Sequence, residues 1–584
     1  MSSNSWKAND ILGLTPGLDL RRSERIYAVG GSNFAFTSLG PRSMFGSRFL
    51  TPYPLGRPAH VQGVRVRLRE GDRCFIFEGQ SILEWSESLG NWRVIWMTPI
   101  TNVSPYRWTV AYINEKIFFC HPVTGIIVYD LDTGQRYAHN GPGVPSQPLA
   151  ICANNGRLVV IDDIYLSWSW QSDGMNFTPA LGQAGQQKIN DRVAGFPIMV
   201  NTYAQGVLTW TTGGLLRSEF TGDQEVYRHR NMNTEFRPIN SFCTLQTDEN
   251  TIMFLDERGL FQSTGGVPEP VAPLFNEFLI DYIRKNKLAI GQNARIEWDD
   301  LRRFMYVSVS VTPESSLYER AFVLYPNLDK WGVFSESHYG IVPCQIGGSI
   351  REGSYFGYVG ADGRVNFWSD FASREVIATD PGLNLRCPVN QKITQVDPGG
   401  SWTLGSSTIG FNSEPMTPML GPAGFYAPGS NTPAAAEVQG LGAKIQIGLI
   451  RFDQEVSFDA LTEVISVGIG NNESGPEGQL SEDYLTVPDG FSDEDYNALT
   501  GAEDFGEGTL AYVNHGIRII STIDGRSQFQ EAIPDEVQFA EGMRHYACST
   551  VGVWHILELT ANAPGEAFHL RAFELTATPA GRLS

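Results

Sequence analysis

The chain has 584 residues and a mass of 64.6 kDa, which excludes a single small domain and predicts two to four folding units. Hydrophobic residues make up 42% and charged residues 18%, so the chain can form a buried core and is too apolar for a disordered protein. The net charge of −21 disfavours a protein whose main role is to bind nucleic acid phosphates, because such domains are usually basic.

The N-terminal segment, residues 1–100, is predicted to contain strands that face a partner. It begins without the apolar region of a signal peptide, and the chain has no run of 18 apolar residues, so we expect neither general secretion nor a membrane segment. Arg65, Arg67 and Arg69 alternate with apolar residues, and a strand would place all three on one face. We expect that face either to dock an acidic partner protein or to be merely an exposed strand.

Residues 101–370 are predicted to form β-propeller blades. An apolar strand, a polar turn and a second apolar strand recur, and the second strands centre near residues 118, 159, 208, 253, 306 and 366. Turn dipeptides such as Asn155-Gly156 and Asp362-Gly363 fall between the paired strands, as hairpins require. Repeats of this length indicate an all-β propeller of about six blades, although a string of β-sandwiches would give similar alternation.

One helix interrupts the β pattern. Residues 273–287 place an apolar stripe on one helical face, with Pro273 near the start and three basic residues near the end, which suits the helix dipole. We expect an inserted helix that packs on the ring between two blades.

Residues 371–584 are predicted to form an additional C-terminal all-β domain. Residues 396–436 are rich in Gly, Ser, Pro and Thr and are interpreted as a long loop or extended arm. Residues 452–517 contain 15 acidic residues and no Lys or Arg. The acidic insert near 471–510, with a short helix predicted after Ser492, is interpreted as a solvated acidic surface; calcium binding is an alternative, but the regular spacing of a calcium loop is missing.

The sequence contains no motif for catalysis, a cofactor or a metal. We find no GxSxG, HExxH, P-loop or strand-linked GxGxxG pattern, and the nine His residues are dispersed. The seven Cys residues are never closer than 32 positions, so we expect buried free thiols of a protein folded in a reducing cytoplasm. The stretch 172–177, SDGMNF, resembles the Asp-box turn of sialidase-like propellers, in which the Asp caps a hairpin; a single copy and no assignable carboxylate pair disfavour glycan cleavage.

Several stretches resemble the nozzle proteins of short-tailed bacteriophages, the tail tubular protein B family. They are NNGRLVVIDD at 154–163, LSWSW at 166–170, DGMNFTP at 173–179, TIMFLDERGLF at 251–261, GVWHILEL at 552–559, FHLRAFEL at 568–575, PGLDL at 16–20, GPRS at 40–43 and FGSR at 45–48. The sequence departs from familiar members at 396–436 and 471–510.

The resemblance implies a structural virion protein, assembled in the host cytoplasm and not an enzyme. It implies a propeller-bearing subunit of a homohexamer ring at the distal end of the tail, which binds an upstream adaptor ring, carries tail fibres on its flanks and gates genome ejection. Viral DNA would pass without specific binding, since a negatively charged wall repels phosphate. The alternatives are a tail-associated host-surface adhesin or glycan-cleaving propeller and, less specifically, a cytoplasmic propeller scaffold.

Overall fold

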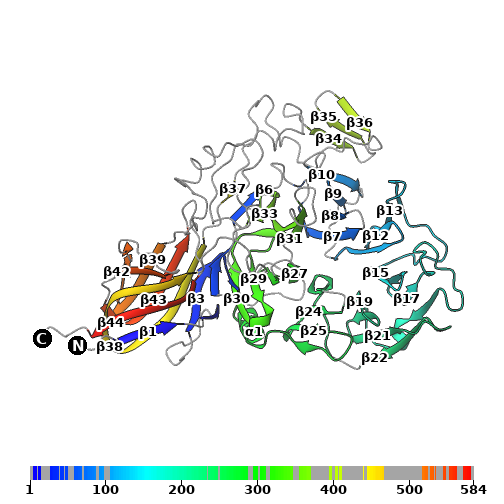
Figure 1. Cartoon of the computed structure of the whole chain (residues 1–584). Helices are drawn as coiled ribbons and strands as arrows, with labels where there is room; N and C mark the ends of the chain where they lie inside the picture. The colour runs from blue at the N-terminus through cyan, green and yellow to red at the C-terminus, as the bar shows by residue number, and fades with distance from the viewer. Residues whose placement is uncertain are drawn as a thin grey trace.

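The computed structural model describes most of the first 369 residues and a set of C-terminal strands. The described residues are 4–8, 11–14, 26–37, 40–44, 46–49, 55, 58–68, 71–79, 81–86, 91–97, 106–232, 235–247, 250–286, 294–299, 303–310, 316–345, 354–369, 393–397, 401–404, 407–410, 438–439, 443–465, 516–523, 526–531, 533–534, 543–547, 551–561 and 570–579. Figure 1 shows a ring of small sheets beside a second β unit that contains both chain ends.

The ring consists of seven antiparallel sheets, which we number as blades 1 to 7 in chain order. Blades 1 to 3 contain β7 (Gln62–Leu68), β8 (Gly71–Glu78), β9 (Ser81–Ser86) and β10 (Asn91–Trp96); β11 (Thr109–Ile113), β12 (Lys116–His121), β13 (Gly125–Asp130) and β14 (Arg136–Ala138); and β15 (Ala150–Asn154), β16 (Arg157–Ile161), β17 (Tyr165–Trp168) and β18 (Gly185–Lys188).

Blades 4 to 7 continue the same order. They contain β19 (Pro197–Tyr203), β20 (Gly206–Thr211), β21 (Gly214–Phe220) and β22 (Tyr227–Asn231); β23 (Thr244–Gln246), β24 (Ile252–Asp256), β25 (Gly259–Ser263) and β26 (Glu269–Pro270); β27 (Arg295–Asp299), β28 (Phe304–Val309), β29 (Arg320–Tyr325) and β30 (Lys330–Phe334); and β31 (His338–Gln345), β32 (Ser354–Gly360) and β33 (Val365–Ser369).

The second strand of a blade is buried on both faces because a neighbouring blade covers each face. All six residues of β20 and of β28 are buried, and their apolar, β-branched and aromatic side chains suit such a strand. The predicted hairpin turn at Asn155-Gly156 is confirmed, with φ angles of 48° and 70° that match a type I′ turn.

The predicted all-β propeller is confirmed, with two corrections to its repeat. The ring has seven blades where we expected about six, because residues 62–96, which we placed in the N-terminal segment 1–100, form blade 1. In blade 7 the second strand is β32, and the strand near residue 366 is the third, β33.

The ring closes through a strand from the N-terminal segment. β6 (Gly46–Phe49) pairs antiparallel with β33 and becomes the fourth strand of blade 7, and the chain then continues into blade 1. Strands β4 (Phe34–Thr37) and β5 (Gly40–Ser43) extend blade 6 beyond β30. Closure therefore joins residues more than 300 positions apart and covers the outer edge of β33.

The second β unit combines both ends of the chain. In its ten-stranded sheet β1 (Asn4–Ala8) pairs with β44 (Leu570–Pro579), and β3 (Ile26–Ser32) pairs with β38 (Ala443–Ile465). The other members are β2 (Ile11–Leu14), β39 (Gly516–Ile523), β40 (Arg526–Glu531), β41 (Ile533–Pro534), β42 (Met543–Ala547) and β43 (Val551–Ala561). The predicted unit 371–584 is thus all-β where described, but it also takes strands from the first 32 residues.

The Gly- and Pro-rich stretch 396–436 is not wholly the loop that we predicted. β34 (Ile393–Asp397), β35 (Ser401–Leu404) and β36 (Ser407–Gly410) form a three-stranded sheet, and β37 (Val438–Gln439) pairs with β6. The rest of that stretch, the acidic insert 471–510 and its predicted helix lie outside the described residues.

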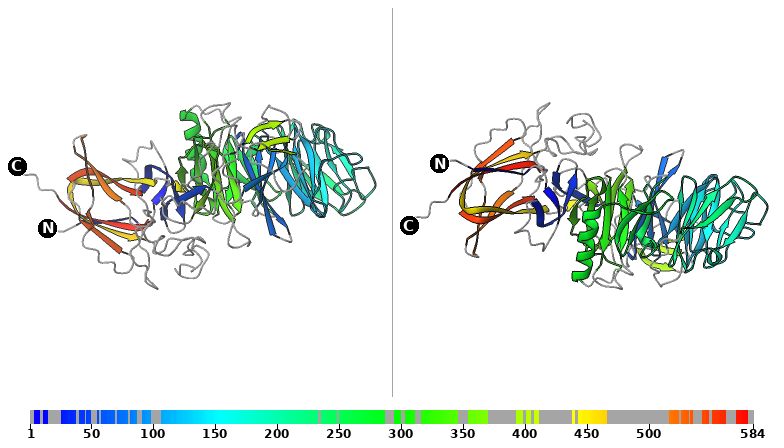
Figure 2. Two further views of the ribbon diagram at one scale, coloured as in Figure 1. Left: turned by 90° about the horizontal axis from the view of Figure 1, so that it is seen from above. Right: turned by 90° about the horizontal axis from the view of Figure 1, so that it is seen from below.

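The predicted helix is confirmed as α1 (Pro273–Asn286), between blades 5 and 6 (Figure 2). Phe275 and Leu279 are buried in a core shared with blade 6 and the ten-stranded sheet, whereas Leu274, which we expected on the buried face, is 40% exposed. The carboxylate of Asp329 caps the helix by accepting hydrogen bonds from the backbone N–H groups of residues 274 and 275, at 2.7 and 3.0 Å.

A proline in the closing strand tests the importance of ring closure. Ser47→Pro removes a ladder N–H from β6, which is paired on both sides, and should lower the free energy of unfolding by about 3 kcal/mol. Ser47→Thr keeps the N–H and should leave stability nearly unchanged. Chemical denaturation measures both; equal stability of the two variants would mean that β6 does not hold the ring closed.

Candidate functional site

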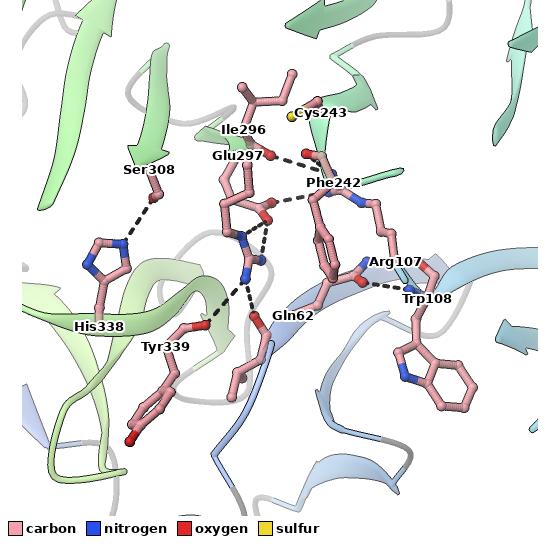
Figure 3. Close-up of polar contacts among 12 residues, drawn as sticks. Gln62, Arg107, Trp108, Phe242, Cys243, Ile296, Glu297, Ser308, His338 and Tyr339 are labelled. Carbon is pink, nitrogen blue, oxygen red and sulfur yellow. Dashed lines mark hydrogen bonds and ion pairs between the residues drawn. The ribbon is translucent and has the colours of Figure 1, made fainter. Parts of the chain in front are cut away.

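Polar side chains gather where the first strands of several blades begin (Figure 3). They come from blades 1, 2, 5, 6 and 7, which are the segments near residues 61, 107, 243, 296 and 339. We call this group the axial network. Its charged members are Arg107, Arg295 and Glu297.

Arg295 is the fully buried centre of the axial network. Its guanidinium forms an ion pair with Glu297, two residues along β27, and donates hydrogen bonds to the carbonyl oxygens of Val61 and Tyr339 at 2.6 and 3.3 Å. The same guanidinium lies 5.1 Å from the ring centroid of Phe242. One side chain thus connects blade 6 to blades 1 and 7 and to the start of blade 5.

Arg107 approaches the same carboxylate from blade 2, on the other side of the ring. Its Nη2 lies 3.2 Å from Oε2 of Glu297, and its Nη1 donates to the carbonyl oxygens of residues 242, 244 and 296. Its backbone N–H donates to the hydroxyl of Ser241 at 3.0 Å. The next residue, Trp108, is bound through its backbone N–H and C=O to the amide of Gln62, both at 2.9 Å.

The electrostatic balance of the axial network requires Glu297. Burial lowers the pKa of Arg107, and Glu297 opposes that shift. For Arg295 burial also lowers the pKa, but Glu297 and Tyr318 together outweigh burial, so the pKa is raised. Two guanidiniums share one carboxylate, and backbone carbonyl oxygens accept further donors, so the charge of Glu297 is balanced and the second positive charge is stabilised by hydrogen bonds. All three guanidinium nitrogens of Arg295 and both terminal nitrogens of Arg107 have acceptors, so the network joins blades 1, 2, 5, 6 and 7.

A buried Ser–His pair lies beside the axial network. Nδ1 of His338 lies 2.9 Å from the carbonyl oxygen of Glu336 and must donate to it, so Nε2 accepts from the hydroxyl of Ser308 at 3.0 Å. Burial, followed by the nearby Arg295, lowers the pKa of His338 to about 4. Both side chains are fully buried, so this hydrogen bond links blade 6 to blade 7 and is not placed to meet a substrate.

The predicted arginine strand is confirmed as a strand, β7, the innermost strand of blade 1. Val66 packs into the core between blades 1 and 2, so Arg65 and Arg67 share the opposite face, as expected. Arg65 is half-buried and Arg67 is exposed, while Arg69 lies outside the described residues. Whether this face docks an acidic partner stays a prediction.

The Asp-box-like stretch forms the turn that its sequence predicts. The carboxylate of Asp173 accepts a hydrogen bond from the backbone N–H of Met175 at 3.0 Å. Gly174 lies against the ring of Phe118 in blade 2, where a Cβ would come within 2.5 Å of a ring atom. The turn therefore has a packing role between blades 2 and 3.

The axial network was missed by the sequence analysis, although a signal was present. In β27 the charged residues Arg295, Glu297 and Asp299 alternate with apolar ones, and charges in a buried strand must be paired. The expectation of buried thiols is confirmed for Cys74, Cys120, Cys152 and Cys243.

Within the described ranges, no helix has the length and apolar character needed to cross a membrane.

Comparison with known proteins gives structural likenesses and no match in sequence. No family model and no curated protein matches the sequence. Among solved structures, the chain is similar to YCF48 bound to D1 peptide, with 10% identity and a TM-score of 0.33 over 58% of this chain and 98% of that chain. It is also similar to the RRP9 WD40 repeats, with 9% identity and a TM-score of 0.33 over 55% of this chain and 97% of that chain. The extracellular domain of the one component system BT4673 from B. thetaiotaomicron has 11% identity and a TM-score of 0.36 over 62% of this chain and 47% of that chain.

Removal of the shared carboxylate tests the axial network. Glu297→Gln leaves two buried guanidiniums without a counter-charge and should lower the free energy of unfolding by about 3–5 kcal/mol. The matched control is Glu219→Gln, which removes a carboxylate that pairs with Arg217 and is more exposed than that of Glu297. This control should lower the free energy of unfolding by about 1 kcal/mol or less. Equal losses in chemical denaturation would show that the axial carboxylate has no special role.

Proposed function

We propose that the chain is a structural subunit of the tail nozzle of a short-tailed bacteriophage, and that it is not an enzyme. The observation that carries the proposal is where the nozzle-like stretches fall in the fold. GPRS is β5, and FGSR includes the first three residues of the closing strand β6. TIMFLDERGLF covers β24 and the start of β25, and GVWHILEL and FHLRAFEL cover much of β43 and β44. The resemblance therefore involves the ring, its closure and the ten-stranded sheet together.

The axial network supports a wall role for the propeller. Arg107 and Arg295 connect blades 1, 2, 5, 6 and 7, so a DNA duplex that threaded one propeller would have to break these contacts, and we place the duplex between copies of the chain instead. Six copies at −21 each would carry −126, and a wall of that sign repels phosphate. In this proposal the chain handles DNA without binding it specifically and forms part of the gate for genome ejection.

The propeller and the ten-stranded sheet lie at opposite ends of the molecule, which suits contacts with different partners at the two ends. β1 pairs with β44, which brings both chain ends into the ten-stranded sheet at one end of the molecule, and the propeller occupies the other end (Figures 1 and 2). We propose that such a body joins a homohexamer in the virion tail, contacts an upstream adaptor ring and carries fibres on its flanks.

The symmetry of the assembled particle tests this function. Cryo-electron microscopy of tails that contain the chain should reveal six copies arranged around one axis. A single copy in each tail, or a chain that is absent from purified virions, would contradict the proposal.

Charge reversal on β7 tests the docking face. Replacement of Arg65, Arg67 and Arg69 by Glu should prevent tail completion, because an acidic neighbour would then be repelled. Arg320→Glu, at an exposed position of blade 6, is the control and should permit assembly. Electron microscopy of lysates gives the readout, and circular dichroism verifies that each variant is folded. Normal tails from the triple variant would remove the docking role.

A further inference from the structure

The outer edge of blade 4 is an exposed strand edge with a basic surface. β22 pairs with β21 on one side and is the last strand of its sheet within the described chain. Its residues Arg228 and Arg230 are both exposed, and they share one face because side chains alternate along a strand. A strand edge of this kind offers backbone N–H and C=O groups to another polypeptide.

Two further exposed arginines lie where β22 ends. The side chain of Asn231 donates to the carbonyl oxygen of Arg192 at 2.8 Å, and Nη1 of Arg237 donates to the carbonyl oxygen of Thr212 at 2.8 Å. Thr212 in turn pairs through its backbone N–H with the carbonyl oxygen of Phe196 at 2.9 Å. We call Arg192, Arg228, Arg230 and Arg237 the basic rim.

The arginines of the basic rim form no ion pair with another residue in the described ranges, although the chain as a whole carries −21 and Glu219 lies opposite Arg228 in the strand register. Phe196, beside the rim, is 74% exposed. An exposed aromatic ring next to unpaired arginines is typical of a contact surface for a partner with acidic and aromatic side chains.

The chain itself contains a segment of matching chemistry. Residues 482–507, which lie outside the described residues, belong to the stretch 452–517 with 15 acidic residues and no Lys or Arg. Four aromatic residues are interspersed among the acids: Tyr484, Phe491, Tyr496 and Phe505. Charge and aromatic content are thus complementary to the basic rim and Phe196.

We propose that the basic rim of one copy binds the acidic segment 482–507 of a neighbouring copy. The inference rests on the proposed homo-oligomer and names one of its contacts. A contact between two different surfaces of identical chains is heterologous and closes into a ring when the rotation allows it. A polypeptide is favoured over DNA because it can pair with the edge of β22, and because the overall negative charge repels free DNA.

Charge reversal with a compensating swap tests the contact in the full-length chain. Arg228→Glu combined with Arg230→Glu should weaken self-association at least tenfold in sedimentation velocity. Adding Asp493→Lys and Asp495→Lys to that variant should restore much of the association, because the charges are then complementary again. Arg320→Glu is the matched surface control and should associate like the unaltered chain. Unchanged thermal unfolding is expected for all variants, since the substituted positions in the ring are exposed.

The outcomes separate this contact from the proposed function. Unchanged association of the Arg228→Glu, Arg230→Glu variant, or failure of the Lys swap to restore association, would overturn the contact while leaving a six-fold nozzle possible. A chain that is monomeric both in solution and in tails would instead overturn the nozzle. Fluorescence anisotropy with a short DNA duplex is the third arm: binding that depends on Arg228 and Arg230, with association unchanged, would assign the basic rim to DNA.

Discussion

Every blade of this propeller needs a neighbour on both faces, and that requirement shapes the whole chain. The second strands are apolar on both sides, so an open row of sheets would expose a hydrophobic face at each end. Closure removes both faces, and the structure achieves it with β6, taken from ahead of blade 1 and paired with β33. Since the N-terminal chain must return to the last blade, its preceding strands are left beside the C-terminal strands. The ten-stranded sheet built from both chain ends follows from this arrangement.

The axial network adds a second constraint, on what the ring can do. Unpaired polar groups at a propeller centre would bind water or a ligand, but here Glu297 pairs with two arginines, and carbonyl oxygens accept further donors of both guanidiniums. A buried carboxylate is stabilised by neighbouring donors in the ten-stranded sheet as well. There burial alone would raise the pKa of Glu558, yet hydrogen bonds from Lys444 and Gln446 hold it below its ordinary value. At both places the buried charges join strands of the fold.

The sequence predicts the local elements well because each has a local cause. Alternating apolar residues, the Asn155-Gly156 turn and the apolar stripe of α1 depend only on nearby residues, and each is confirmed. The use of β1, β3 and β6 depends on pairings over hundreds of positions, and no local pattern carries that information. Blade 1 is different, because it consists of local hairpins that we assigned to the N-terminal segment. The charges of Arg295 and Glu297 could be noticed locally, but their partner Arg107 could not, since Arg107 and Glu297 are 190 positions apart.

In the proposed function, the propeller is a wall element beside which the viral chromosome passes. A high-resolution density map of tails arrested during ejection tests this directly, because it locates DNA relative to each propeller. We expect duplex density on the common axis of the copies, with side-chain density for Arg107, Glu297 and Arg295 intact inside every ring. Duplex density threading the centre of an individual propeller, with that network opened, would contradict the account.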